Sequence, residues 1–289
     1  MCGFCGCGQP DAPAGHVHEH DHEHGHGHGH EHEHVHAHDR EHAHDHDHTH
    51  GAGHAHDHGN THSHAHPDTR TVSLEADILA KNNHIAAHNR ARLADARVLA
   101  LNLVSSPGAG KTTLLERTLR DLGGELHFCV IEGDQQTDND ARRIAATGVP
   151  VTQVTTGQVC HLDAQMVQNA MGHIPLRPHG VLMIENVGNL VCPSLFDLGE
   201  AGKVVVASVP EGQDKPAKYP YMFRAAELVL LNKIDLLPYV RFDMAEFMAM
   251  AGHINPGVQV LPLSATTGEG LPAWYDWLRQ RARNLAAKA

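Results

Sequence analysis

The fold of this chain is decided by the stretch Ser105-Ser106-Pro107-Gly108-Ala109-Gly110-Lys111-Thr112-Thr113. An apolar run of strand length, residues 98–104, precedes it, and a segment with helical spacing, residues 114–120, follows it. A glycine-rich turn between a strand and a helix is typical of a phosphate-binding loop (P-loop), whose backbone N–H groups face an anion. Ser105 stands where the first glycine of that pattern usually occurs, and that glycine serves the turn more than the phosphate.

The residues of this loop have distinct expected roles. Glycine at two positions lets the backbone curl so that its N–H groups point inward. Lys111 can reach the β- and γ-phosphates of a nucleotide, and the hydroxyl group of Thr112 can ligate Mg²⁺. The predicted nucleotide-binding residues of the loop are Gly108, Ala109, Gly110, Lys111, Thr112 and Thr113.

Apolar runs and helical segments alternate along the rest of the chain. The expected strands are residues 98–104, 126–131, 150–154, 180–185, 203–208, 227–231 and 258–262. The expected helices are residues 111–122, 138–146, 161–171, 243–251 and 271–286, after a leading helix from 73 to about 96 that packs on the domain. Near-continuous apolar strands separated by helices are typical of an α/β fold, with a mostly parallel sheet and helices on both faces.

Acidic side chains follow two of the expected strands, where ligands of such sheets bind. Asp134 is expected to hold Mg²⁺ directly or through water, and Asp138 to orient the attacking water. Alternatively some of these acids only begin the next helix, Asp138 first among them. At the end of the strand 180–185, Glu185 is expected as a second catalytic carboxylate, and Gly188 as a sensor of the γ-phosphate.

The motif Asn232-Lys233-Ile234-Asp235, after the strand 227–231, predicts the base that is bound. Asp235 can accept hydrogen bonds from N1–H and the 2-amino group of guanine, which adenine does not offer, and Lys233 can lie over the base. Behind a P-loop this pattern favours GTP over ATP. The segment Ser264-Ala265-Thr266 is a weaker match to the loop that contacts the guanine O6 atom in GTPases.

Composition excludes several other functions. The net charge is −12, and residues 1–70 contain 12 acidic residues against 2 arginines, so the rest of the chain is near neutral and has no general basic face for nucleic acid. No apolar run reaches membrane-spanning length, and the beginning of the chain is not typical of a secretory signal. The six cysteines indicate metal or thiol chemistry in a reducing compartment, the cytoplasm.

Two N-terminal segments favour metal binding. Cys2, Cys5 and Cys7, with the α-amino group of Cys2 once Met1 is removed, offer a set of donors that suits square-planar Ni²⁺ and also tetrahedral Zn²⁺, unless these are incidental cysteines at a disordered end. Residues 16–66 hold 23 of the 30 histidines, and this composition predicts a disordered tract that binds several metal ions loosely. A purification tag and a purely solubilising tail are the alternatives.

A further metal site is a hypothesis from spacing. Cys160 and His161 are expected at the beginning of the helix 161–171, and Cys192 follows Glu185 by a few residues. These three donors can form a partial site that water or a second subunit completes. The alternative, two buried small apolar residues and a surface histidine, is equally consistent with the spacing.

On these motifs the chain resembles the HypB family of nickel-insertion GTPases, which act in the maturation of NiFe-hydrogenases, over essentially its whole length. The motifs that carry the resemblance are Cys2-x-x-Cys5-Gly6-Cys7, the histidine tract, Ser106–Thr112, Glu132-Gly133-Asp134, Glu185–Asn189 and Asn232–Asp235. The resemblance implies a SIMIBI-like P-loop GTPase domain, Mg²⁺-dependent GTP hydrolysis with slow intrinsic turnover, and a nickel or zinc site formed by Cys160, His161 and Cys192 at a dimer interface.

The resemblance also implies partners and a division of the chain. The partners are a second copy in a homodimer promoted by GTP or metal, a HypA-type nickel carrier, a SlyD-like prolyl isomerase in some bacteria, and the hydrogenase large-subunit precursor. The expected parts are residues 1–9, 10–70 and 71–289. Two alternatives stay open: a urease-type nickel-insertion GTPase, in which the N-terminal cysteine motif is not expected, and a passive nickel or zinc store that hydrolyses nothing.

Overall fold

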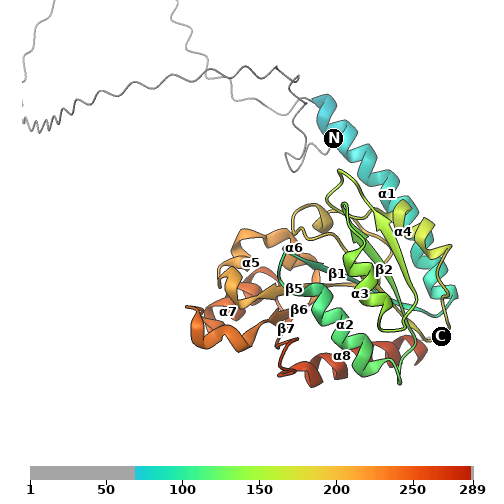
Figure 1. Cartoon of the computed structure of the whole chain (residues 1–289). Helices are drawn as coiled ribbons and strands as arrows, with labels where there is room; N and C mark the ends of the chain where they lie inside the picture. Colours follow the sequence, from blue (N-terminus) through green and yellow to red (C-terminus); the bar gives the residue numbers. More distant parts are fainter. Residues whose placement is uncertain (1–68, 288–289) are drawn as a thin grey trace, which may run out of the picture. The chain divides into compact units, whose positions relative to one another are not determined.

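Seven runs rich in valine, leucine and isoleucine form one parallel sheet in the computed structural model, which describes residues 69–287 (Figure 1). The strands are β1 (Leu99–Ser105), β2 (Phe128–Asp134), β3 (Val151–Thr155), β4 (Val181–Glu185), β5 (Gly202–Ser208), β6 (Ala226–Asn232) and β7 (Gln259–Pro262). Their order is β3-β2-β4-β1-β5-β6-β7, and every neighbouring pair is parallel. The predicted fold class is confirmed, and all seven expected strands form.

Helices cover both faces of this sheet. They are α1 (Thr69–Asp95), α2 (Lys111–Leu122), α3 (Asn139–Ala145), α4 (Ala164–Met171), α5 (Lys215–Lys218), α6 (Pro220–Ala225), α7 (Met244–Ile254) and α8 (Leu271–Ala287). Because side chains alternate along a strand, Leu101 of β1 packs with α2 and α8, whereas Ala100 packs with α1 and α4 and Val104 with α6 and α7. Burial of both faces explains the near-continuous apolar strands.

The beginning of α4 differs from the prediction. The helix begins at Ala164, because the side chain of Asp163 caps it by accepting a hydrogen bond from the backbone N–H of Met166 at 2.7 Å. Cys160 and His161 therefore lie in the loop that precedes α4 and are not part of a helix, so this detail of the prediction was wrong.

The leading helix α1 packs on the domain through only part of its length. Asn89 donates hydrogen bonds to the carbonyl groups of Ala164 and Leu198, and Leu93 is buried against α4. Towards its beginning, the apolar side chains of Leu74 and Ile78 are 60% and 50% exposed, so this part of the helix does not pack on the domain as predicted.

The Cys2-Cys5-Cys7 motif and the histidine-rich tract lie outside the described residues. Between residues 69 and 287, none of the helices combines the length and the apolar character that crossing a lipid bilayer requires.

Candidate functional site

The P-loop and the carboxyl ends of four strands enclose a cavity of about 640 Å³. Its lining comprises residues 105–113, 132–136, Asp140, Arg143, Val187, Gly188 and Lys233. Gly108 and Gly110 have φ angles of +76° and +91°, which glycine adopts without strain. A Cβ atom on Gly110 would also lie 2.6 Å from the side-chain nitrogen of Asn232, so this position of the loop has no room for a side chain.

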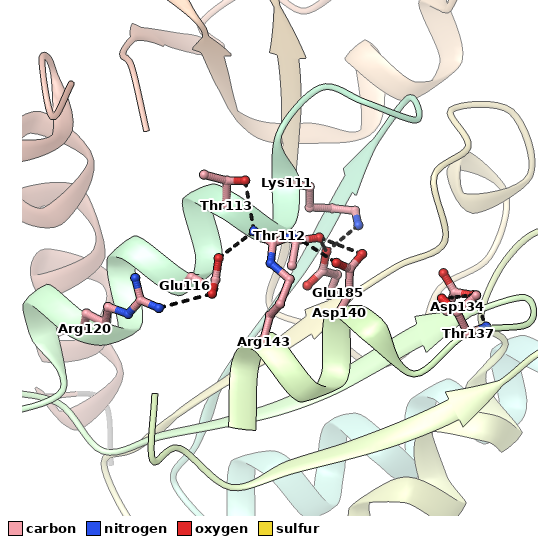
Figure 2. Close-up of polar contacts among 10 residues, drawn as sticks. All are labelled: Lys111, Thr112, Thr113, Glu116, Arg120, Asp134, Thr137, Asp140, Arg143 and Glu185. Atoms are coloured by element: carbon pink, nitrogen blue, oxygen red, sulfur yellow. Dashed lines mark hydrogen bonds and ion pairs between the residues drawn. The ribbon is translucent and has the colours of Figure 1, made fainter. Parts of the chain in front are cut away.

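Lys111 and Thr112 both bind Glu185, which lies at the end of β4 (Figure 2). The ammonium group of Lys111 lies 2.7 Å from Oε1 of Glu185, and the Thr112 hydroxyl donates to the same oxygen at 2.6 Å. Glu185 is buried, and its Oε2 atom has no hydrogen-bond partner among the described residues. The predicted phosphate-binding lysine therefore forms an ion pair with a carboxylate whose second oxygen can bind another ligand.

A second group of carboxylates lies beside this pair. One oxygen from each of Glu132, Asp134 and Asp140 lies within 4.8 Å of the others. Burial, and then the nearby Glu185 and Asp134, raise the pKa of Glu132 to about 8. Burial alone would raise the pKa of Asp134, but hydrogen bonds from the N–H groups of Thr137 and Gln136 outweigh it and hold this pKa below its usual value.

These oxygens fit the hard cation that P-loop proteins use. Mg²⁺ prefers oxygen ligands and is usually held by one or two carboxylates together with phosphate oxygens. Thr112, Asp134 and Glu185 could hold Mg²⁺ beside the phosphates, and the unpartnered Oε2 of Glu185 is an oxygen that such an ion would satisfy.

The structure separates two acids that lie two positions apart in the sequence. The carboxylate of Asp138 forms an exposed ion pair with Arg142 at 2.6 Å and does not line the cavity. Asp140 lines the cavity, and its Oδ2 atom lies 3.1 Å from the Thr112 hydroxyl, whose single hydrogen is shared between Asp140 and Glu185 (Figure 2). Sequence reasoning missed Asp140, because its contact with Thr112 depends on α3 packing next to α2, which no local sequence pattern shows.

The predicted base-binding residues gather beside the P-loop. The side chain of Asn232 donates to the carbonyl group of Ala109 at 3.0 Å and accepts from the N–H groups of Lys233 and Ala265. Lys233 has a φ angle of +62°, and its ammonium group donates to the carbonyl oxygen of Gly108 at 2.6 Å. These bonds tie the loops of the two motifs together.

Asp235 is the acceptor that stays available at this end of the site. Its Oδ1 atom is buried and has no hydrogen-bond partner among the described residues. An unpaired buried acceptor is expected where a ligand supplies the donor. Ser264 instead accepts a hydrogen bond from the N–H of Thr267, and Ala265 donates to Asn232. A contact of Ser264 or Ala265 with a base stays a prediction.

The three donors of the hypothetical inner metal site do come together. Ligand atoms of Cys160, His161 and Cys192 all lie within 4.8 Å of one another, the two sulfur atoms are 3.3 Å apart, and all three residues are buried. Burial lowers the pKa of His161, although Asp163 opposes the shift, so the neutral imidazole that binds metal is favoured. Its Nδ1 atom has no hydrogen-bond partner in the described part of the chain. Thiolate and imidazole suit Zn²⁺ and Ni²⁺.

Leu162 links this cluster to the cavity. Its backbone N–H donates to the side chain of Asn186 at 3.0 Å, and Asn186 directly follows Glu185. Its side chain packs against the backbone of Gly133, where a Cβ atom would lie 2.8 Å from Leu162 Cγ, and Gly133 directly precedes Asp134. The segment that carries Cys160 and His161 is therefore held between the two strand ends that supply the acidic groups of the cavity.

A P-loop, acidic strand ends and an N-K-x-D motif on a parallel sheet define a P-loop GTPase. The family described as "CobW/HypB/UreG, nucleotide-binding domain" matches residues 99–262. The hydrogenase maturation factor HypB of Escherichia coli (strain K12) is 58% identical over 209 residues, which are 72% of each chain. The chain thus belongs to the HypB family of hydrogenase maturation factors.

Solved structures agree with this assignment. The crystal structure of HypB from Helicobacter pylori in complex with nickel has a TM-score of 0.66 and 38% identity, and covers 71% of this chain and 96% of that one. The crystal structure of hydrogenase maturation factor HypB from Archaeoglobus fulgidus has a TM-score of 0.66 and 37% identity, and covers 70% of this chain and 99% of that one.

Proposed function

We propose that this protein hydrolyses GTP in an Mg²⁺-dependent reaction and uses the nucleotide state to control nickel that it delivers to the NiFe-hydrogenase large-subunit precursor. The observation that carries the proposal is the position of Leu162. It joins the Cys160-His161-Cys192 cluster to Gly133 and Asn186, which neighbour the acidic groups at the phosphates. Membership in the HypB family and the nickel complex of the Helicobacter pylori relative support nickel as the cargo.

The residues of the cavity have different roles in binding the base, binding the phosphates and orienting the attacking water. Asp235 accepts from the guanine base, while the N–H groups of the P-loop and Lys111 bind the phosphates once Lys111 has left Glu185. When bound, Mg²⁺ supplies positive charge that offsets the charge of the phosphates. Asp138 was expected to orient the attacking water, but its exposed pair with Arg142 favours Asp140, which faces the cavity, for this role.

Nucleotide state can reach the metal cluster along the segment that follows β4. Gly188 lines the cavity and packs against Pro107, where a Cβ atom would lie 3.2 Å from Pro107 Cα, and Cys192 begins a 3₁₀ turn a few residues later. Loss of the γ-phosphate would shift this segment and with it Cys192 relative to Cys160. Metal–ligand distances tolerate a spread of only about ±0.2 Å, so a small displacement changes the affinity for nickel.

A nickel titration with GTP and with GDP tests this coupling. In a full-length variant whose Cys2, Cys5 and Cys7 are replaced by alanine, sulfur-to-nickel charge-transfer absorption reports on the inner thiols and not on the histidine tract. The nickel affinity should differ between the two nucleotides, and sedimentation of the same samples should show whether a dimer forms with GTP or metal. Cys192→Ala should remove the absorption band.

The matched control for Cys192→Ala is Cys129→Ala. Cys129 is also a buried thiol, burial raises its pKa to about 12, and it lies outside the metal cluster. This variant should keep both the band and the difference between the nucleotides. Equal nickel affinities with GTP and GDP in the cysteine-free N-terminal background would refute the coupling.

The proposal also includes the target of nickel delivery and the other partners of the protein. We include a HypA-type carrier, a SlyD-like prolyl isomerase and a homodimer among the partners, and the cytoplasm as the location. A Helicobacter hepaticus relative named hydrogenase/urease maturation factor HypB is 38% identical over 220 residues, which favours urease as a second target. Hydrogenase and urease activities in cells that lack this protein, with and without added nickel, separate the two targets.

A further inference from the structure

Two exposed histidines face each other on α1 and do not line the nucleotide cavity. His84 and His88 are one helical turn apart, and their Nε2 atoms are separated by 3.3 Å. The two rings meet edge to face, with centroids 4.8 Å apart. Two ring nitrogens this close carry lone pairs that repel each other, unless a proton or a metal ion lies between them.

The separation also matches the requirement for binding one metal ion. Imidazole nitrogens lie about 2.0–2.1 Å from Zn²⁺, so two of them on one tetrahedral ion are about 3.3–3.4 Å apart, and two adjacent ones at a right angle about 2.9 Å apart. Residues four positions apart on a helix share a face, so the backbone does not have to change for both rings to reach one ion.

The opposite face of α1 holds this pair in place. Asn82 donates a hydrogen bond to the carbonyl of Asp197 at 2.8 Å and accepts one from the N–H of Ala164, while Asn89 donates to the carbonyl groups of Ala164 and Leu198. Both asparagines are buried, whereas His84 and His88 are exposed. The helix therefore presents the two imidazoles to solvent from a fixed element, which reduces the entropy that binding would cost.

We propose that His84 and His88 together bind one borderline divalent ion, Ni²⁺, Zn²⁺ or Cu²⁺, with water in the remaining coordination positions. Imidazole is a preferred ligand of these ions. The site is separate from the Cys160-His161-Cys192 cluster, whose three residues are buried. In the sequence it stands between the histidine-rich residues 16–66 and that cluster. Metal binding by the pair is independent of the proposed function, whereas any part in nickel transfer would rest on it.

Residue-resolved footprinting of the full chain tests the site despite the other 28 histidines. Diethyl pyrocarbonate modifies exposed imidazoles, a bound metal blocks this reaction, and mass spectrometry assigns each modified histidine. With Ni²⁺ alone at about ten times the dissociation constant, the modification of His84 and His88 should slow on the order of tenfold by mass action. The same experiment with Zn²⁺ and Cu²⁺ should order their affinities.

The variant His88→Ala shows whether the two histidines chelate one metal ion together or whether each binds a metal ion alone. In this variant the protection of His84 by Ni²⁺ should disappear, because one imidazole must bind without its partner. His253 is the internal control, since it is an exposed histidine on α7 and should be modified at the same rate with and without the ion. GTP binding by His88→Ala should equal that of the wild type and shows that the variant folds.

Two results would overturn the proposal. Equal protection of His84 in the wild type and in His88→Ala would mean that each histidine binds alone. Unchanged reactivity of both histidines in the wild type, at nickel concentrations that protect the histidines of residues 16–66, would mean that the rings share only a hydrogen bond. Neither result depends on GTP hydrolysis or on delivery to hydrogenase, so the failure of this site and of the proposed function can be told apart.

Discussion

The two ends of the nucleotide cavity are prepared for a ligand in different ways. At the phosphate end, Lys111 and Thr112 already bind Glu185, so a nucleotide has to displace an existing ion pair. At the predicted base end, Oδ1 of Asp235 is buried and has no hydrogen-bond partner among the described residues, so a donor from a ligand would not have to displace an existing bond. We therefore expect the predicted base end to contribute affinity for guanine, and the phosphate end, where the ion pair would exchange partners, to respond to which phosphates are present.

Lys111→Ala should have the largest effect, because it removes the cation from the buried Glu185. Breaking a buried pair of this kind costs about 3–5 kcal/mol. The side chains of Lys111 and Glu185 are 10% and 1% exposed, so solvent screens the pair little. Urea unfolding should show the loss in stability, and GTP turnover should vanish.

A double variant and a surface pair serve as controls for this prediction. Lys111→Ala combined with Glu185→Gln should recover much of the stability, because no uncompensated charge remains, but it should not recover turnover. Lys218→Ala breaks an exposed pair with Asp214 and should cost at most about 1 kcal/mol. If Lys111→Ala is as stable as Lys218→Ala, the phosphate end is not held by its ion pair.

Asp235→Asn should weaken GTP binding with little change in the unfolding midpoint. The carboxylate has no partner for Oδ1 within the described chain, so its loss affects the ligand more than the fold. A hydrogen bond to a charged group contributes about 1.5–3 kcal/mol, which corresponds to roughly 10- to 100-fold in affinity. Competition binding with GTP, ATP and xanthosine triphosphate should show a shift of preference towards xanthine. Equal binding of ATP and GTP by the wild type would show that the base assignment is wrong.

Asn186→Ala should uncouple the phosphate end from the metal cluster. It removes the acceptor of the Leu162 N–H, and a buried unsatisfied donor costs about 1–3 kcal/mol. Coupling between two sites is typically 5- to 150-fold in affinity, and the ratio of nickel affinities with GTP and GDP should fall towards one. Asn169→Ala is the control, since its side chain is exposed on α4 and accepts a hydrogen bond from Gln165 of the same helix. An unchanged ratio in Asn186→Ala would exclude this route.

Tyr275→Phe should have the smallest effect, because it removes one hydrogen bond at the end of α2 that is opposite to the P-loop. The Tyr275 hydroxyl donates to Asp121 at 2.7 Å. Burial by itself raises the pKa of Asp121, but hydrogen bonds from Tyr275 and Arg117 outweigh it and lower this pKa. Loss of the donor should cost about 1 kcal/mol or less at neutral pH.

The pH dependence of this effect follows from the direction of the pKa shift. A carboxylate whose pKa is lower in the folded state stabilises the protein above its unfolded value of about 3.9. This contribution is lost as the pH falls through the folded value. Urea midpoints of the wild type and Tyr275→Phe should therefore converge in acid. A difference that stays constant to pH 3 would mean that Asp121 is not the group involved.

The fold could be predicted from the sequence because its signals are local. Helix α2 begins and ends where its spacing places it, at Lys111 and Leu122, and each apolar run forms a strand. The short helices α5 and α6 escaped prediction, since neither reaches two turns and each has a proline near its beginning. No 3.6-residue period can be read from so few residues.

Candidate site residues could be predicted from the sequence where they belong to a local motif. They could not be predicted where the site forms by contact between segments that are distant in the sequence. In the P-loop and in the Asn232–Asp235 motif, the sequence pattern itself identifies the candidate binding residues. The contact between Cys160 and Cys192 depends on β2 lying between β3 and β4, which no local pattern shows. Asp140 was missed for the same reason, because its hydrogen bond with Thr112 joins two helices.

The ion pair with Glu185 also affects which anions Lys111 can attract. Inorganic phosphate and sulfate arrive without a tightly bound cation and meet the carboxylates of Asp134 and Asp140 on the cavity wall. The one lysine of the P-loop is already neutralised by Glu185, so it offers these anions little attraction. We expect a nucleotide that brings its own divalent cation to offset this repulsion and to free Lys111. Lys111 should then discriminate in favour of a metal–nucleotide complex over free phosphate or sulfate, while Arg143 and Lys233 are the other cations of the cavity lining.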